Sequence, residues 1–159
     1  MTITLKPWEY QHAAAVGIAR FTANWGRPNA AHYDPAKMEP DRSAQVAAAA
    51  CELAVARATN RYWHAGVWHA SEHHLYKHLP DVGSNIEVRR CRTSEAVAVR
   101  RNDAGKIVFA ARTIDEEYRR IEVVGWVAAD DVIPTLAPGQ DWRYIDFGRL
   151  TPVVSGDKK

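Results

Sequence analysis

The chain has 159 residues, of which 47% are hydrophobic and 25% are charged, and its formal net charge at pH 7 is +2. This length suits one domain with its own hydrophobic core, and we treat residues 1–159 as a single domain. The sequence has no run of 18 apolar residues, so we expect no membrane-spanning helix. The small positive charge neither requires nor excludes a nucleic-acid partner.

The N-terminal residues and the two cysteines bear on the compartment. The segment MTITLKPWEYQH lacks a basic stretch followed by an apolar one, so no secretory signal is expected. Cys51 and Cys91 form no CxxC pair, which fits a reducing compartment, although the two thiols could in principle form a bridge. We therefore expect a cytoplasmic location.

The first 60 residues have mainly helical patterns, preceded by a possible short strand at residues 3–5. A first helix is expected after Pro7, and Glu9 in its first turn suits the positive end of the helix dipole. The apolar residues that recur there at helical spacing are Trp8, Ala15, Ile18 and Phe21. Residues 26–41 are rich in Pro, Asn and Asp and read as one long connection.

A second helix is expected after Pro40, with Asp41 as its N-cap and many alanines in its length. Its apolar stripe consists of Val46, Ala49, Ala50 and Leu53. The small residues would let another element pack close to this helix. We describe residues 1–40 as an N-terminal helical extension and residues 155–159 as a frayed tail.

From about residue 86 the pattern changes to segments rich in Val and Ile, which are IEVRRC, AVAVRR, KIVFAARTI and RIEVVGWVA. Asn102, Asp103 and Gly105 separate the second and third of these segments, which is a hairpin signal. Helices followed by a meander of strands predict an α+β, or mixed α/β, domain.

The segment PDVGSNIEVRR, residues 80–90, holds the strongest candidate site. If residues 86–90 form a strand, Glu87 and Arg89 share one face while Ile86 and Val88 pack into the core. Asp81 lies just before this strand. Two nearby carboxylates suit Mg²⁺, which prefers oxygen ligands, and the adjacent cation could stabilise charge on a phosphate.

A third carboxylate, Glu52, lies among small and apolar residues in the segment ACELAVA. With Asp81, Glu87-Val88-Arg89 and the late dipeptide Gly125-Trp126, it occurs in an order that resembles the PD-(D/E)xK nuclease superfamily, and phage-encoded members in particular. The resemblance covers roughly residues 40–133. It implies a restriction-endonuclease-like core in which helices precede the strands.

The resemblance also implies an activity, Mg²⁺-dependent hydrolysis of DNA phosphodiester bonds, with Mn²⁺ as a substitute ion. Asp81 and Glu87 would be metal ligands, Glu52 an accessory acid that completes the metal site, and Arg89 the catalytic cation. The family has lysine at the position of Arg89. Arginine stays protonated and cannot serve as a base, although it can stabilise a phosphate electrostatically.

Several alternatives remain open at this stage. The chain could be a catalytically silent module of the same fold that binds nucleic acid or protein, Glu52 could be a partly exposed helix charge, and Gly125-Trp126 could be a strand end that packs its indole on the core. His69 with His73, and His74 with His78, are spaced as zinc ligands on a helix, with His64 nearby. The aromatics Trp63, Trp68 and Tyr76 could stack on exposed bases or bury a loop.

Overall fold

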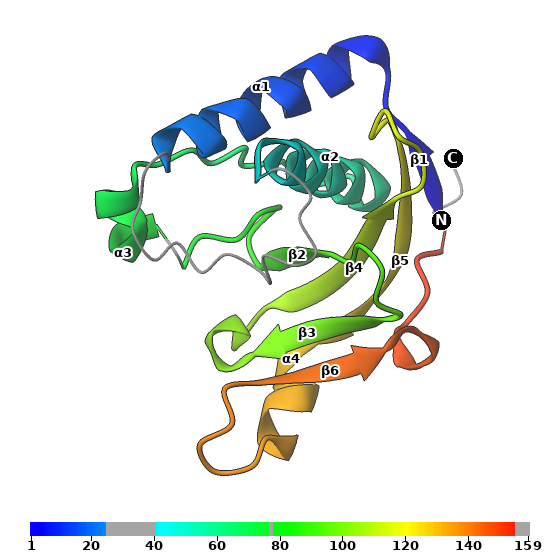
Figure 1. The fold of residues 1–159 in the computed structure, drawn as a ribbon. Coiled ribbons are helices and arrows are strands. Elements are labelled where there is room, and N and C mark those ends of the chain that lie inside the picture. The colour runs from blue at the N-terminus through cyan, green and yellow to red at the C-terminus, as the bar shows by residue number, and fades with distance from the viewer. Residues whose placement is uncertain (25–40, 77, 155–159) are drawn as a thin grey trace.

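Two long helices and a four-stranded sheet form the centre of the computed structural model, which describes residues 1–24, 41–76 and 78–154 (Figure 1). Helix α1 spans Pro7–Ala23, with Pro7 at its start, and helix α2 spans Asp41–Thr59. Both helices were predicted, and the mixed α+β class is confirmed. Of the described helices, none combines the length and apolar character needed to cross a bilayer.

The main sheet has the strand order β1-β5-β4-β2. Strand β1 (Thr2–Thr4) pairs antiparallel with β5 (Arg120–Ala128), and β5 pairs antiparallel with β4 (Ile107–Thr113). Strand β2 (Ile86–Arg90) pairs with β4 in parallel, so that Ile86 lies opposite Ile107. Because β2 stands last in this order, its far edge is open to the loop that precedes it.

A second sheet pairs β3 (Ala96–Arg100) antiparallel with β6 (Trp142–Asp146). Short helices connect the strands, and they are η2 (Ala70–Glu72), α3 (His73–Tyr76), η3 (Arg101–Asp103), α4 (Ala129–Val132), η4 (Ile133–Thr135) and η5 (Phe147–Arg149). Figure 1 shows α1 and α2 on one side of the main sheet and the β3–β6 pair on the other.

The core consists of two apolar clusters, one on each face of the main sheet. Alternate residues of β4 point into different clusters, with Phe109 and Ala111 facing α2 and with Val108 and Ala110 facing the β3–β6 pair. Cys51 belongs to the first cluster and Cys91 to the second, and neither of these two described residues forms a disulfide. The bridge that the sequence left open is therefore absent.

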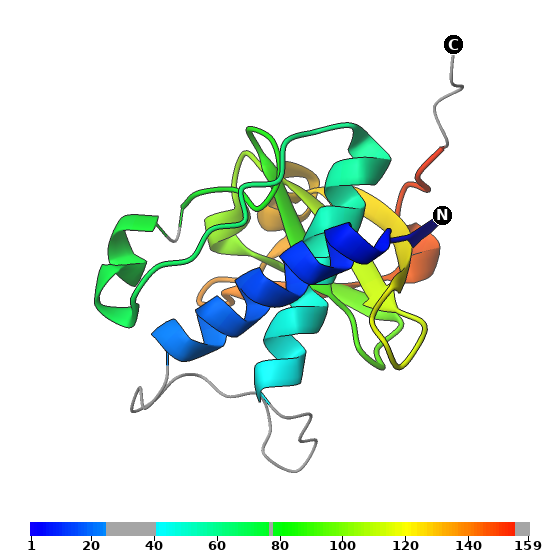
Figure 2. The same cartoon turned by 90° about the horizontal axis from the view of Figure 1, so that it is seen from above.

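The two helices pack against each other through small residues, and this overturns the predicted apolar stripe of α1. Trp8 and Ile18 are 62% and 38% exposed, whereas Ala13 and Gly17 face the core. A Cβ atom on Gly17 would lie 2.5 Å from the Cα of Val46, so the backbones meet where a larger residue would separate them. Figure 2 shows α1 lying across α2. The predicted stripe of α2 is confirmed.

The predicted hairpin around residues 102–105 is wrong, although a turn exists there. Helix η3 and Gly105, with φ of +75°, reverse the chain, but β3 pairs with β6 and β4 pairs with β2 and β5. Among the described strands of the main sheet, only β4 and β5 form a hairpin of consecutive strands. Residues 25–40, the cap at Asp41 and the tail at 155–159 lie outside what the structure describes.

Candidate functional site

Strand β2 presents Glu87 and Arg89 on one face, as the alternation of its side chains predicts. Ile86 and Val88 are 5% and 8% exposed and belong to the helix-side core, so Glu87 and Arg89 point to the opposite face of the sheet. Arg89 Nη1 donates a short hydrogen bond to Glu87 Oε1. The two side chains therefore form an ion pair within the strand.

Lys106 is the second cation on Glu87. The parallel pairing of β2 with β4 brings it there, because Lys106 immediately precedes the strand residue that lies opposite Ile86. Lys106 Nζ donates to Glu87 Oε2 at 2.7 Å. Burial raises the pKa of Glu87, but Arg89 and Lys106 outweigh it, so this pKa is lower than its ordinary value. Glu87 is ionised and has a cation on each oxygen.

Arg89 also binds Asp103, which is only 1% exposed. Arg89 Nη2 donates to Asp103 Oδ1 at 2.8 Å, and the backbone N–H of Arg100 donates to Oδ2 at 2.8 Å. Arg89 thus bridges two carboxylates and links β2 to η3. Burial lowers the pKa of Arg89, but the negative charges of Glu87 and Asp103 raise it by a larger amount. The pKa is therefore above its ordinary value, and the guanidinium group stays charged.

Asp81 lies at the open edge of β2. Its Oδ2 accepts the backbone N–H of Val88 at 2.8 Å, and its own N–H donates to the carbonyl of Ile86 at 2.9 Å. Gly83, with φ of +58°, makes the expected bend between these segments. Burial and the negative charges of Glu52 and Glu87 raise the pKa of Asp81 well above its ordinary value.

Glu52 is a buried member of an ion pair, so its interpretation as a partly exposed helix charge is wrong. It is 6% exposed and accepts hydrogen bonds from both terminal nitrogens of Arg20, at 2.6 and 2.9 Å. Trp63 Nε1 donates to it at 2.9 Å, and Arg20 Nε donates to the carbonyl of Gly66 at 2.8 Å. Glu52 therefore ties α1 and the loop after α2 to the core.

These carboxylates form a connected cluster but do not converge on one point. Glu52 binds Arg20 on the helix side of the sheet, and Glu87 binds Lys106 on the opposite face. Asp81 lies at the edge of β2, where the negative charges of both residues raise its pKa. Within the described ranges, no three or more His, Cys, Asp or Glu side chains are grouped to hold a metal ion. The predicted site of three carboxylates is therefore not assembled.

The donor chemistry of Asp81 and Glu87 nevertheless fits a hard divalent cation. With Asp81 ionised, the cluster contains four carboxylates, including Asp103, and three cations, which are Arg20, Arg89 and Lys106. The carboxylates then exceed the cations by one negative charge. We assign this excess to Asp81, because the negative charges of Glu52 and Glu87 raise its pKa. A carboxyl placed among like charges is stabilised by a bound cation. Both oxygens of Glu52 bind Arg20 and Trp63, just as both oxygens of Glu87 bind Arg89 and Lys106, so of these carboxylates Asp81 is the one that no side-chain cation contacts among the described residues.

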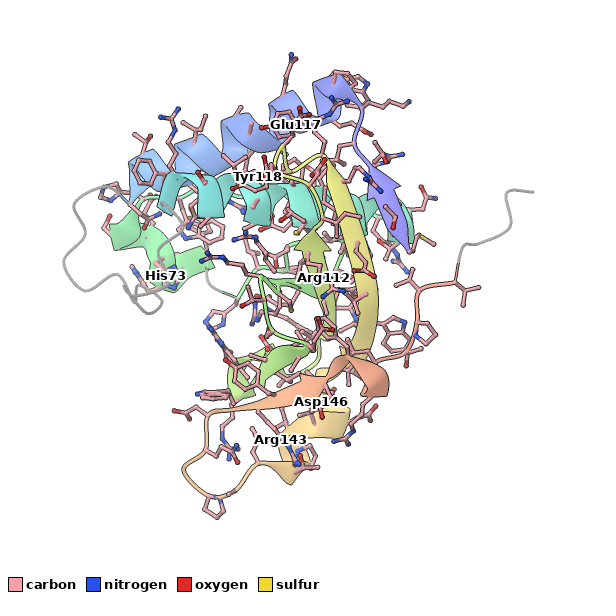
Figure 3. All side chains as sticks on the ribbon, turned by 45° about the vertical axis from the view of Figure 1, so that its right-hand side comes forward. His73, Arg112, Glu117, Tyr118, Arg143 and Asp146 are labelled. Atoms are coloured by element: carbon pink, nitrogen blue, oxygen red, sulfur yellow. The ribbon has the colours of Figure 1, made fainter. Side chains whose placement is uncertain are left out.

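A pocket of about 220 Å³ opens beside Asp81. Its lining consists of Arg20, His64, Gly66, Val67, Trp68, Tyr76, Leu79, Pro80 and Asp81. Aromatic and apolar side chains make most of its wall, and the charged groups are contributed from the carboxylate cluster. The labelled His73 marks α3, beside which this pocket lies, on the side of the molecule away from β1 in Figure 3.

The histidine segment does not form a continuous α-helix. Helix η2 is followed by α3, which covers only His73–Tyr76, so His69 and His73 do not share a regular helical face. The Nδ1 atom of His69 is 2.8 Å from the hydroxyl of Ser71, and the Nδ1 atom of His74 is 3.0 Å from the carbonyl of the same residue. The spacing that suggested zinc ligands is thus used in local contacts.

The remaining motif residues have structural roles. Trp63 is 7% exposed and packs in the helix-side core, which confirms that it buries a loop. A Cβ atom on Gly125 would lie 2.8 Å from the carbonyl oxygen of Thr151, so this glycine allows close passage of the C-terminal segment. Trp126 pairs with Thr151 through two backbone hydrogen bonds and packs against the core.

Sequence reasoning missed Arg20, Lys106 and Asp103. Arg20 and Lys106 are far from their partners in the sequence, and Asp103 looked like an ordinary turn residue. Comparison of the chain with protein-family models, with curated proteins and with solved structures finds no match. The resemblance to the PD-(D/E)xK superfamily therefore stays a prediction.

Proposed function

We propose that this chain is a metal-dependent nuclease that hydrolyses DNA phosphodiester bonds, encoded by a phage or another mobile element. The observation that supports it best is the arrangement at the edge of β2, where the negative charge of Glu87 helps to raise the pKa of Asp81 and Glu87 contacts both Arg89 and Lys106. Carboxylates that can hold a cation, placed beside fixed positive charges, suit a phosphodiester substrate.

In this proposal Asp81 and Glu87 hold Mg²⁺, with Mn²⁺ as a substitute. The bound ion would supply activation of a water molecule and neutralisation of phosphate charge. Glu52 acts as a positioning residue, because its ion pair with Arg20 fixes the loop that carries Gly66 beside the site. Arg89 holds Glu87 and Asp103 in register.

Lys106 takes the part of the lysine that the segment Glu87-Val88-Arg89 lacks. Its ammonium group touches Glu87, and its side chain is 12% exposed. A lysine ammonium group in such a site can orient a water molecule or contact a phosphate oxygen. In this proposal the replacement noticed in the sequence is compensated in space by the residue that precedes the neighbouring strand β4.

A second function has one observation in its favour. Both oxygens of Glu87 are already paired with protein cations, which lowers the need for a metal. A module that uses the same fold to bind nucleic acid or protein without cutting it would keep this ion-pair network as a structural element. The nuclease assay separates the two functions.

The assay follows degradation of linear, nicked and single-stranded DNA with Mg²⁺, with Mn²⁺ and with a chelator. Glu87→Gln keeps the size of the side chain but removes the charge, so cleavage should fall at least about a hundredfold, the scale for loss of one electrostatic stabiliser. Lys106→Met should also lower the rate, while DNA affinity should persist in Glu87→Gln.

Glu95→Gln is the matched control, because Glu95 also pairs with an arginine, Arg112, but its side chain is 73% exposed. This variant should cut at the wild-type rate. If wild-type protein cuts none of the substrates with either ion, the silent binding module replaces the nuclease. If Glu87→Gln cuts as fast as wild type, the activity belongs to other residues.

A further inference from the structure

The pocket beside Asp81 has the size and lining for a single flat ring system. Its volume is about 220 Å³, below the roughly 300–1,000 Å³ of pockets that enclose larger organic ligands. Trp68 and Tyr76 both line it, with ring centroids 5.9 Å apart and planes inclined by 33°. Aromatic walls of this kind bind planar rings by stacking.

The position of Trp68 is fixed by its surroundings. Its Nε1 donates to Nδ1 of His73 at 3.3 Å, and its ring packs against the backbone of Gly66, where a Cβ atom would lie 2.5 Å from the ring. Gly66 is held in turn by Arg20, which binds its carbonyl. The aromatic wall is therefore tied to the same ion pair that positions Glu52.

The lining of the pocket also includes polar side chains. His64 Nε2 lies 2.6 Å from the carbonyl oxygen of Gly83, so this nitrogen carries the hydrogen of that bond. Asp81 adds a carboxylate to the lining. A ring that stacks on Trp68 can thus meet hydrogen-bonding groups at its edge.

We propose that this pocket takes an unpaired nucleobase from the strand whose backbone passes the Asp81–Glu87 pair, so that the protein prefers single-stranded DNA or frayed ends to intact duplex. This inference rests on the proposed function and names the form of its substrate. A base inside a duplex is already stacked on its neighbours and would have to leave the stack to enter the pocket.

Binding in the absence of metal tests the pocket independently of cleavage. The affinity of the full chain for a fluorescently labelled single-stranded oligonucleotide and for the matching blunt duplex is measured by anisotropy in a chelator. Wild type should bind the single strand more tightly. Trp68→Ala should weaken that binding roughly 5- to 150-fold, which corresponds to ~1–3 kcal/mol for one stacked base.

Trp8→Ala is the matched control, since Trp8 is 62% exposed and lies on α1 at the end away from α3 (Figure 1). It should leave the affinity unchanged. Gly66→Val provides a second variant that keeps the indole but displaces it, and it should weaken binding in the same direction. Thermal unfolding of each variant is measured alongside, to check that the variant is folded under the binding conditions.

An oligonucleotide of abasic sites separates base stacking from contacts to the backbone. It should bind wild type more weakly than the normal strand and should not distinguish wild type from Trp68→Ala. Equal binding of single strand and duplex by wild type would overturn the inference, as would equal effects of Trp68→Ala and Trp8→Ala. If the wild-type protein cuts no DNA but binds the single strand in a way that depends on Trp68, the nuclease proposal is refuted and the base-binding pocket is retained.

Discussion

The Arg20–Glu52 ion pair gives a direct test of whether Glu52 supports the fold. The two side chains are 16% and 8% exposed. In Arg20→Met, Glu52 would lose the cation that binds both of its oxygens, and the Trp63 indole N–H would still donate to it. Removing one partner of a buried ion pair costs about 3–5 kcal/mol, because the other charge is left uncompensated.

This cost should be visible as a large change in thermal stability. For a domain of this size, 1 kcal/mol shifts the melting temperature by about 2–4 °C, so Arg20→Met should lower it by about 6–20 °C. Circular dichroism during heating and urea titration measures the effect. In Arg20→Met/Glu52→Gln no charge is stranded, and the amide oxygen can still accept from Trp63, so the double variant should be more stable than the single one by about 1–3 kcal/mol.

Arg119→Met is the matched control. Arg119 pairs with Glu117 at 3.7 Å, and the two side chains are 38% and 75% exposed. Exposed ion pairs contribute about 0–1 kcal/mol, so this variant should lose at most a few degrees. If Arg20→Met is no less stable than Arg119→Met, or if the double variant is as unstable as Arg20→Met, Glu52 is not held by a buried pair and its positioning role is refuted.

Three further predictions concern other parts of the molecule. The raised pKa of Asp81 means that the folded protein keeps a proton that the unfolded chain releases, so its contribution to stability falls as pH rises above about 4, the ordinary aspartate value. Asp81→Asn should therefore be more stable than wild type at neutral pH but not below about pH 4, and urea unfolding over a pH series that shows no such divergence would contradict this. Burial raises the pKa of Cys91 to about 11, and Cys51 is 0% exposed, so a thiol reagent at neutral pH should label neither in the folded protein and both in urea. Gly17→Leu should destabilise the α1–α2 contact by about 1–3 kcal/mol or more, whereas Ala15→Leu, on the exposed side of the same helix, should change stability by less than about 0.5 kcal/mol in chemical unfolding.

The local patterns of the sequence identified most of the elements because they depend on neighbouring residues. Pro7 begins α1, the alanine-rich segment forms α2, and the Val- and Ile-rich segments form strands. The buried face of α1 was missed because its partner is another helix at close range. Ala13 and Gly17 make that contact by being small, so a search for large apolar residues selected the exposed Trp8 and Ile18 instead.

The pairing of strands and the partners of charged residues depend on distant parts of the chain. The Asn-Asp-Ala-Gly turn did not indicate that β3 belongs to a separate sheet. Because β3 is absent from the main sheet, β2 and β4 become parallel neighbours, and the sequence did not indicate this either. Lys106 reaches Glu87 only through that pairing. Alternation along β2 did predict that Glu87 and Arg89 share a face, because that relation lies within one strand.

The pairing of β1 with β5 determines when the fold can close during synthesis. Thr2 lies opposite Glu122, so β1 cannot pair with β5 until about 120 further residues have been synthesised. At about 5–20 residues per second, this delay lasts roughly 6–24 s. Throughout that time Leu5, which is 0% exposed in the finished fold, has no β5 beside it. The nascent N-terminal segment therefore depends on its helices, or on a chaperone, to protect apolar surface until the sheet is complete.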